Sequence, residues 1–204
     1  MTDIIWASII SIIFLSLFVI AEFLRKKGAK AETTRKFVHF GGAFVTIFFP
    51  FILTSHWAVL ALAIGFASIM FITKKIGWLQ SVHGVERKSD GAIYHPIAIY
   101  TCFLYSQIIN QPMFYVISIL ILAISDALAA LVGKSYGANE YLVEVGTRKT
   151  IEGSVSFFLT SFLIVHLILL LATQTGRVES VLIALLISII VTIFEGITCS
   201  YTSP

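Results

Sequence analysis

The sequence is dominated by mainly apolar stretches that are about as long as a helix crossing a lipid bilayer. A helix needs roughly 20 residues to span the roughly 30 Å of hydrocarbon. Lipid admits only helices or closed barrels, and the alternating pattern of barrel strands is absent. The stretches are residues 4–24, 37–53, 57–72, 92–109, 113–133, 151–172 and 179–199. We therefore expect an all-α integral membrane protein, a polytopic bundle of about seven transmembrane helices that forms a single domain over residues 1–204.

The composition agrees with a membrane protein. Only 12% of the 204 residues are charged, whereas 58% are hydrophobic. Soluble domains carry about 25% charged residues, so most soluble classes are excluded. The net charge of +3 gives little reason to expect a nucleic acid as partner. Two isolated cysteines, Cys102 and Cys199, form neither a CxxC pair nor a disulfide framework.

The basic residues predict how the chain is oriented. Thirteen of the 14 Lys and Arg residues fall in the first, third and fifth loops. They are Arg25, Lys26, Lys27, Lys30, Arg35 and Lys36, then Lys74, Lys75, Arg87 and Lys88, then Lys134, Arg148 and Lys149. Because basic loops stay on the cytoplasmic side, we expect the N-terminus outside and the active site on the cytoplasmic face. Basic loops also serve topology and attraction to anionic lipids, so a single Lys is weak evidence of a site.

Asp126 is the most informative single residue. A carboxylate about two turns inside a membrane helix costs on the order of 3 kcal/mol, so it needs a partner or a function. Helical spacing predicts one face of small residues around it, made of Ala123, Asp126, Ala130, Gly133 and Gly137. Such a face lets a ligand approach closely. It is equally typical of helix packing, and a protonated Asp126 could donate a hydrogen bond to another helix.

A second signal is the segment 145–154, which precedes and opens the sixth stretch. Arg148 and Lys149 can neutralise phosphate oxygens, and the Thr147 and Thr150 hydroxyls can donate to them. The free N–H groups of a helix start also favour anions. The alternative is an ordinary helix start, with Thr150 as the N-cap.

A third signal opens the second stretch, where Arg35, Lys36 and His39 precede Gly42. The two cations suit phosphate, although snorkelling cations and a packed histidine are the alternatives. Arg87 in the third loop is similar in kind. Glu195, near the end of the last stretch, is another acid within an apolar stretch that needs an explanation.

These residues resemble a known family. Asp126 with Gly133 and Gly137, followed by Arg148-Lys149-Thr150-Ile151-Glu152-Gly153-Ser154, resembles the cytidine-nucleotide region of the CTP-dependent lipid-alcohol kinases. That group contains dolichol kinase, phytol kinase and yeast-type diacylglycerol kinase. Arg35-Lys36-x-x-His39 and the Arg87…Gly91…Pro96 segment are similar to the family's pattern as well. The resemblance covers most of the chain.

The resemblance implies a kinase that transfers the γ-phosphoryl group of CTP, or another nucleoside triphosphate, to the hydroxyl of a lipid such as phytol, polyprenol, dolichol or diacylglycerol. It implies Mg²⁺ or Ca²⁺ as cofactor, and the nucleotide, the lipid alcohol and the bilayer as partners. Implied catalytic residues are Asp126, Lys149, Arg35 and Lys36, with Asp126 as metal ligand. Implied nucleotide-binding residues are Gly133, Gly137, Arg148, Thr150, Glu152 and Gly153, and implied substrate-binding residues are His39, Arg87 and Glu195.

The chain departs from the family pattern at its end. Family members continue past the glutamate that Glu195 matches with an Asp-Asn pair and more apolar sequence, whereas this sequence ends at Pro204. We therefore expect a truncated or divergent C-terminus.

Three other classes compete with the kinase interpretation. An enzyme like phosphatidate cytidylyltransferase would use the same nucleotide but would release pyrophosphate and make a CDP-lipid. A transporter would place Asp126 and Glu195 on an ion path, but paired broken helices or inverted repeats are not evident in the sequence. A noncatalytic scaffold would not need Asp126.

Overall fold

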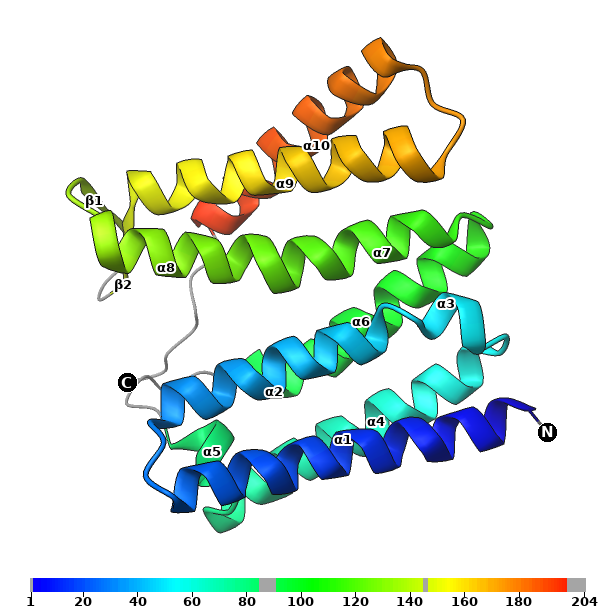
Figure 1. Ribbon diagram of the computed structural model, residues 1–204, viewed down its shortest axis with the longest axis vertical. Coiled ribbons are helices and arrows are strands. Elements are labelled where there is room, and N and C mark those ends of the chain that lie inside the picture. The colour runs from blue at the N-terminus through cyan, green and yellow to red at the C-terminus, as the bar shows by residue number, and fades with distance from the viewer. Residues whose placement is uncertain (1, 85–90, 145–146, 198–204) are drawn as a thin grey trace. The chain divides into compact units, whose positions relative to one another are not determined.

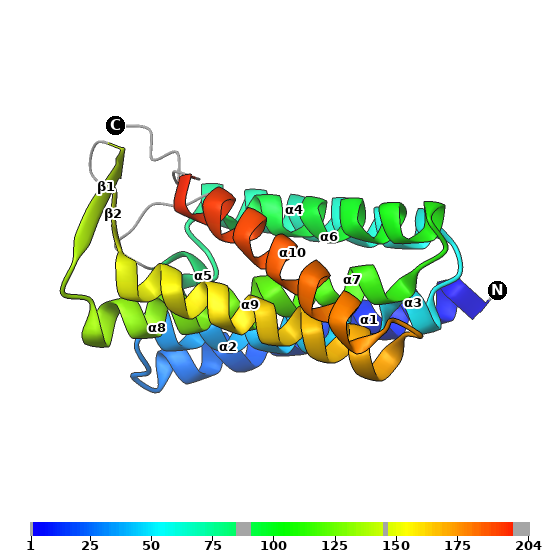
Figure 2. The same ribbon diagram turned by 90° about the horizontal axis from the view of Figure 1, so that it is seen from above.

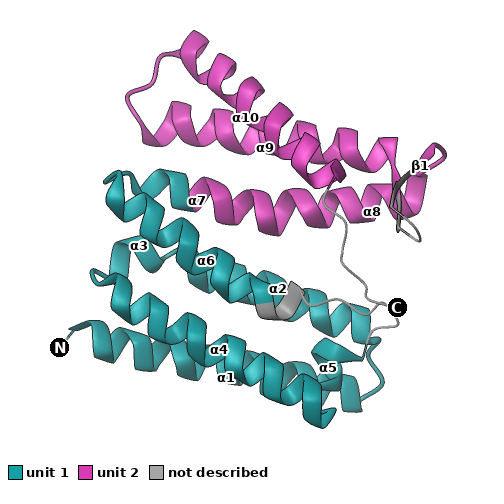
Figure 3. Cartoon of the chain, turned by 180° about the vertical axis from the view of Figure 1, so that it is seen from behind, with its two compact units in different colours: residues 1–115, 202–204 teal, residues 116–201 magenta. Residues whose placement is uncertain are grey.

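The computed structural model describes residues 2–84, 91–144 and 147–197. The chain divides into two compact units, with the boundary inside one helix, between Tyr115 and Val116 (Figure 3). We describe each unit by itself. Each of the seven predicted stretches is helical over most of its described residues, although the stretch 37–53 is interrupted at residues 47–48. The prediction of an all-α membrane protein is confirmed, apart from one short hairpin.

The first unit consists of helices joined by short loops (Figure 1). They are α1 (Thr2–Lys26), α2 (Ala31–Thr46), α3 (Phe49–Ile52), α4 (His56–Ile76), α5 (Gln80–His83), α6 (Gly91–Ile108) and the start of α7 (Pro112–Leu120). Helix α1 contacts α2, α4 and α5, and α4 contacts α6. Phe18, Met70 and Val82 form a buried cluster among these helices. Apolar packing of this kind holds the short α5 against the longer helices.

Hydrogen bonds also hold α5 in place within the first unit. The Thr34 hydroxyl donates to the Ser81 carbonyl at 2.7 Å, and the Ser81 N–H donates to a Glu22 carboxylate oxygen at 3.1 Å. The chain leaves α4 through Gly77, whose φ of 77° is the left-handed conformation that glycine adopts without strain. Helices α1, α2 and α5 are therefore tied together by polar as well as apolar contacts.

The second unit is a group of long helices with a hairpin at one end (Figure 1). It contains the rest of α7, the π-helical turn η1 (Ile121–Ser125), α8 (Asp126–Tyr136), strands β1 (Glu140–Glu144) and β2 (Thr147–Thr150), α9 (Ile151–Ala172) and α10 (Arg177–Ile197). Helix α9 contacts both α8 and α10. Phe157, Val165 and Ala184 belong to the buried cluster between these helices. Helix α9 is therefore the centre of this unit.

The hairpin was not expected from the sequence. Strands β1 and β2 are antiparallel, with Tyr141 opposite Lys149 and Leu142 opposite Arg148. Figure 2 shows the hairpin extending beyond the end of α8 and leading directly into α9. Residues paired across an antiparallel ladder point to the same side, so Tyr141 and Lys149 share one face of the hairpin.

Among the described residues, five helical segments are long and apolar enough to cross a membrane: Thr2–Lys26, His56–Ile76, Pro112–Tyr136, Ile151–Ala172 and Arg177–Ile197. The predicted span 37–53 is divided between α2 and α3, because Pro50 stands near the start of the new helix α3. Helix α2 has 16 residues, about 24 Å at 1.5 Å per residue, which is shorter than the hydrocarbon. The predicted span 92–109 is occupied by α6. The count of seven spans stays a prediction.

Candidate functional site

One end of the second unit brings together most of the residues predicted for the nucleotide. Four chain segments meet there: the end of α8, the hairpin, the first turn of α9 and the last turn of α10. Hydrogen bonds and close approaches within this end connect the following residues: Gly133, Gly137, Lys149, Thr150, Glu152, Gly153 and Glu195.

Thr150 begins α9 and packs against two glycines of α8. Its hydroxyl oxygen accepts a hydrogen bond from the Gly153 N–H at 3.1 Å, so Thr150 is the N-cap of α9, as the alternative interpretation of this segment had it. A role of Thr150 in nucleotide binding stays a prediction. A Cβ added at Gly133 would lie 2.7 Å from the Thr150 Oγ1, and one added at Gly137 would lie 2.5 Å from the Thr150 Cγ2. A Cβ at Gly153 would lie 3.0 Å from the Ala129 carbonyl oxygen. The glycines therefore permit a close crossing of α8 and α9, and their nucleotide-binding role stays a prediction.

Lys149 forms an ion pair with Glu195. The Lys149 Nζ lies 2.6 Å from the Glu195 Oε1, and it also donates to the Glu195 main-chain carbonyl in the last turn of α10. Both side chains are about a fifth exposed, at 21% each. A cation is favourable at a helix C-terminus, because the unpaired carbonyls there carry partial negative charge. The ion pair therefore joins the hairpin to α10, and the Lys149 side chain stays partly exposed.

Glu152 lies in the first turn of α9 and holds the loop that precedes the hairpin. Its carboxylate accepts hydrogen bonds from the Asn139 side-chain amide at 2.9 Å and from the Asn139 main-chain N–H at 3.3 Å. The Ile151 N–H donates to the Asn139 carbonyl at 3.0 Å. A carboxylate in the first turn is also stabilised by the helix dipole. Glu152 thus fixes the path of the chain into the hairpin.

Asp126 lies at the start of α8, immediately after the π-helical turn η1. Its side chain is exposed, and it makes no hydrogen bond or ion pair with any residue that the structure describes. Ala123 does not belong to the predicted small-residue face, because it lies in η1 and is buried whereas Asp126 and Ala130, one turn apart in α8, are exposed. A π turn holds one extra residue and shifts the faces that follow it. The face against α9 instead contains Ser125, whose hydroxyl accepts from Ser161 at 3.0 Å.

The remaining predicted residues lie in the first unit or outside the described part. Arg35 forms a bidentate pair with Glu32, at 3.0 and 3.2 Å, and both side chains are exposed. Lys36 has no hydrogen bond or ion pair among the described residues. The His39 ring lies 5.2 Å from the His95 ring, and its Nε2 is buried without a described hydrogen-bond partner. Arg87 and the Arg148 side chain lie outside the described residues.

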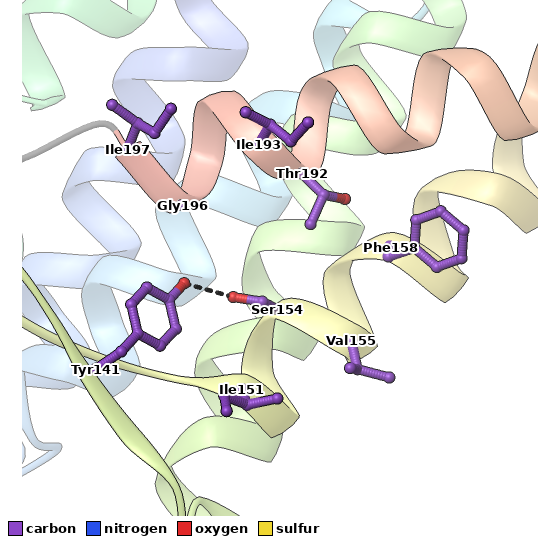
Figure 4. Close-up of a pocket in the computed structure, with 9 residues that line it drawn as sticks. All are labelled: Tyr141, Ile151, Ser154, Val155, Phe158, Thr192, Ile193, Gly196 and Ile197. Carbon is purple, nitrogen blue, oxygen red and sulfur yellow. Dashed lines mark hydrogen bonds between the residues drawn. The ribbon is translucent and has the colours of Figure 1, made fainter.

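A pocket at the same end of the second unit contains residues that the sequence analysis did not identify. It has a volume of about 690 Å³ and lies between β1, α9 and α10 (Figure 4). Its wall is mainly apolar, with Tyr141, Ser154 and Thr192 as the polar members. The Tyr141 and Ser154 hydroxyls are 2.7 Å apart. Ser154 closes the segment that resembles the family, whereas Tyr141 belongs to no motif. Only the pairing of the hairpin brings Tyr141 to α9, so the sequence offered no signal for that residue.

Comparisons with known proteins show the family to which the chain belongs. No solved structure matches it. It is 32% identical over 145 residues to a phytol kinase of Synechocystis sp., a match that covers 71% of this chain and 62% of that relative's length. A sequence model described as the cytidylyltransferase family matches residues 2–201. The chain therefore belongs to the cytidylyltransferase family, and its resemblance to the CTP-dependent lipid-alcohol kinases is confirmed.

Proposed function

We propose that this protein is a lipid-alcohol kinase that transfers the γ-phosphoryl group of CTP, or of another nucleoside triphosphate, to the hydroxyl of a membrane lipid such as phytol, a polyprenol, dolichol or diacylglycerol. The observation that carries the proposal is the partly exposed Lys149 side chain, whose ammonium is held by Glu195 where a candidate membrane span begins. A cation in that place can neutralise phosphate next to a bilayer that dissolves the acceptor. Membership of the family and the phytol kinase relative support the same conclusion.

The reaction makes modest demands on the protein. The alcohol oxygen forms a bond to the γ-phosphorus, the bond to the β,γ-bridging oxygen breaks, and the hydroxyl proton leaves for a base. The products are a lipid monophosphate and a nucleoside diphosphate. Phosphoryl transfer relies mainly on positioning and charge neutralisation, which suits a site of few charges. Asp126, exposed and without a described partner, is the proposed base or metal ligand.

The described residues fit a divalent cation that arrives with the nucleotide. No group of three or more His, Cys, Asp or Glu residues in the described ranges could hold a metal by itself. Mg²⁺ is commonly held by one or two carboxylates together with substrate phosphates. Asp126 offers such a carboxylate, and a bound Mg²⁺ or Ca²⁺ would neutralise phosphate charge. Arg35, Lys36, Arg148 and Lys149 are proposed to bind phosphate oxygens, with Thr150, Glu152, Gly133, Gly137 and Gly153 around the nucleotide.

We also propose the topology that the basic residues predict, with seven spans, the N-terminus outside and the site on the cytoplasmic face. The support is the concentration of 13 of the 14 Lys and Arg residues in alternate loops. Single cysteines at Ala29 and at Asn110, in a background without the native cysteines, test it with a membrane-impermeant maleimide. Labelling of Asn110→Cys alone in intact cells agrees with the proposal, whereas labelling of Ala29→Cys contradicts it.

A second candidate is an enzyme that makes a CDP-lipid from phosphatidate. The description of the matched family model, cytidylyltransferase, favours it. The two reactions move different phosphorus atoms of CTP. A kinase transfers the γ-phosphorus, whereas a cytidylyltransferase keeps the α-phosphorus in the lipid product.

The deciding experiment uses membranes that contain the protein with α- or γ-labelled CTP, γ-labelled ATP, and phytol, farnesol, a polyprenol, diacylglycerol or phosphatidate. The kinase proposal expects γ-label in the lipid fraction with one of the alcohols. Label from the α position with phosphatidate would instead establish the second candidate. Asp126→Asn should reduce the kinase rate by about 10²–10⁴-fold, as the loss of a catalytic acid or base does. An unchanged rate would remove Asp126 from the chemistry.

A further inference from the structure

The pocket between β1, α9 and α10 forms because two helices diverge. Ser180, Ala184 and Ser188 are fully buried and occur at every fourth position of α10, so their small side chains let α10 lie close to α9. Figure 2 shows α10 crossing α9 obliquely, with the end of α10 lying apart from the start of α9 in that view. Ile151, Val155, Phe158 and Ile193 line the resulting space. The cavity is thus an apolar gap beside helices that are themselves candidate membrane spans.

The polar groups of the pocket are hydroxyls at the hairpin end. Tyr141 reaches over from β1 to Ser154, and their 2.7 Å contact uses one proton of the pair (Figure 4). Gly196 lies beside this tyrosine, and a Cβ there would make only an ordinary contact with the Tyr141 oxygen, at 3.5 Å. The Thr192 Oγ1 is buried and has no hydrogen-bond partner among the described residues. An unpaired buried hydroxyl costs about 1–3 kcal/mol, which a polar group of a ligand would offset.

The charged pair lies next to this polar end. Lys149 is opposite Tyr141 in the hairpin, and Glu195 immediately precedes Gly196. None of the nine residues that line the pocket is charged. A nucleotide or another polyanion would therefore lack cations inside the pocket, whereas a neutral molecule would find apolar walls and hydroxyls. The volume of about 690 Å³ lies within the range of about 300–1,000 Å³ typical of small-molecule sites.

We propose that this pocket binds the acceptor of the proposed kinase reaction, an uncharged alcohol on a hydrocarbon chain. The alcohol's hydroxyl lies among Tyr141, Ser154 and Thr192, and its chain lies along Val155 and Phe158 of α9. This inference rests on the proposed function for the identity of the ligand, and on the pocket for its position. It places the acceptor oxygen close to Lys149, which is the cation proposed for the phosphate.

The test separates binding from catalysis by using a probe that needs no nucleotide. The protein in phospholipid vesicles is irradiated with hexadecanol that carries a diazirine on its chain, and the labelled residues are mapped by mass spectrometry. The proposal expects labels on α9 and α10 around the pocket, with competition by unlabelled hexadecanol and not by hexadecane. Equal competition by hexadecane, or labels confined to other helices, would overturn it.

Matched variants sharpen the test. Val155 is 50% exposed and lines the pocket, whereas Leu159, one turn further along α9, is 53% exposed and does not line it. Val155→Trp should reduce probe labelling and raise the KM for the alcohol at least about tenfold with the nucleotide KM unchanged, a change worth about 1.4 kcal/mol. Leu159→Trp should change neither. If Val155→Trp behaves like Leu159→Trp, the pocket is not the acceptor site.

The Thr192 hydroxyl provides an independent check. Thr192→Val keeps the shape and removes the hydroxyl, so it should weaken competition by hexadecanol, and Thr192→Ser should restore it. Labelling at the pocket without any kinase activity supports this inference while the proposed function fails. Kinase activity that is unaffected by Thr192→Val and Val155→Trp supports the proposed function while this inference fails.

Discussion

Helix α9 packs against α8 on one side and against α10 on the other, and the two interfaces are built differently. Toward α8, Gly153 and Ser161 lie in a close crossing, where the Ser161 hydroxyl is paired with Ser125 at 3.0 Å. Toward α10, Ser154 and Val155 border a pocket of about 690 Å³, and the Thr192 hydroxyl finds no hydrogen-bond partner among the residues that the structure describes. Both interfaces use small residues, so residue size alone does not distinguish them. The difference indicates that the α8 side serves stability, and that the α10 side is available for a ligand.

The largest expected effect comes from removing the charge that joins the hairpin to α10. Lys149→Met leaves the Glu195 carboxylate without its ammonium partner in a site only 21% exposed. We expect a loss of roughly 1.5–3 kcal/mol in the free energy of unfolding, the range of hydrogen bonds to charged groups. Equilibrium unfolding in mixed micelles measures it. Lys36→Met, at a lysine without a described partner, is the control and should change stability by less than about 0.5 kcal/mol.

An added methyl group should lower the free energy of unfolding more on the side of α9 that faces α8 than on the side that faces α10. A Cβ at Gly137 would lie 2.3 Å from the Gly133 carbonyl oxygen, which is backbone and cannot move aside. We expect Gly137→Ala to destabilise the protein by about 1–3 kcal/mol through overpacking. Gly196→Ala meets only an ordinary contact at 3.5 Å. Equal unfolding midpoints for these two variants would remove the contrast between the two sides.

The first turn of α9 depends on its cap. Thr150→Ala removes the acceptor for the Gly153 N–H and should cost about 0.5–2 kcal/mol. Thr160→Ala is the matched control in the same helix, because its hydroxyl donates only to the Ser156 carbonyl one turn earlier. Thermal unfolding in detergent, followed by circular dichroism, compares them. A larger loss for Thr160→Ala would show that the cap does not stabilise this helix.

The smallest expected effects on stability come from removing hydroxyls on the two sides of α9. Ser161→Ala leaves the Ser125 hydroxyl unpaired and should cost about 0.6 kcal/mol, the average for hydrogen bonds between membrane helices. Thr192→Val removes a hydroxyl that has no described partner, so stability should stay equal or rise. The double variant Ser125→Ala/Ser161→Ala should recover part of the loss. A destabilising Thr192→Val would indicate that this hydroxyl is paired within the protein.

The sequence was sufficient for the long helices, because length and apolar composition determine which segments a bilayer accepts. The N-cap role of Thr150 appeared only as the alternative to phosphate binding, because a hydroxyl at a helix start suits either use. The division between α2 and α3 was missed, although Pro50 was visible in the sequence as a residue that can start a helix. The apolar residues on both sides of Pro50 led to the prediction of one continuous span over residues 37–53.

The site was harder to predict because its contacts join distant segments. The Lys149–Glu195 pair joins residues 46 positions apart, and both residues had been selected for separate roles. The hairpin was missed because its first strand, Glu140–Glu144, is short and follows directly after a helix and a loop. The face of Asp126 was predicted with α-helical spacing, whereas the turn before it is π-helical. Local periodicity does not reveal a single extra residue in a turn.

That extra residue has a genetic consequence. A π turn is equivalent to an α-helix with one residue inserted, so deleting one codon within Ile121–Ser125, such as that of the exposed Leu122, would restore a regular helix. Asp126 would then keep nearly its present direction relative to the buried Ile117 and Ile119, because a π turn winds less per residue and its extra residue adds almost no rotation. One residue inserted within the regular helix α8 would instead rotate the residues that follow it by about 100°. The turn is therefore a place where the length of the helix can vary while the carboxylate keeps its direction.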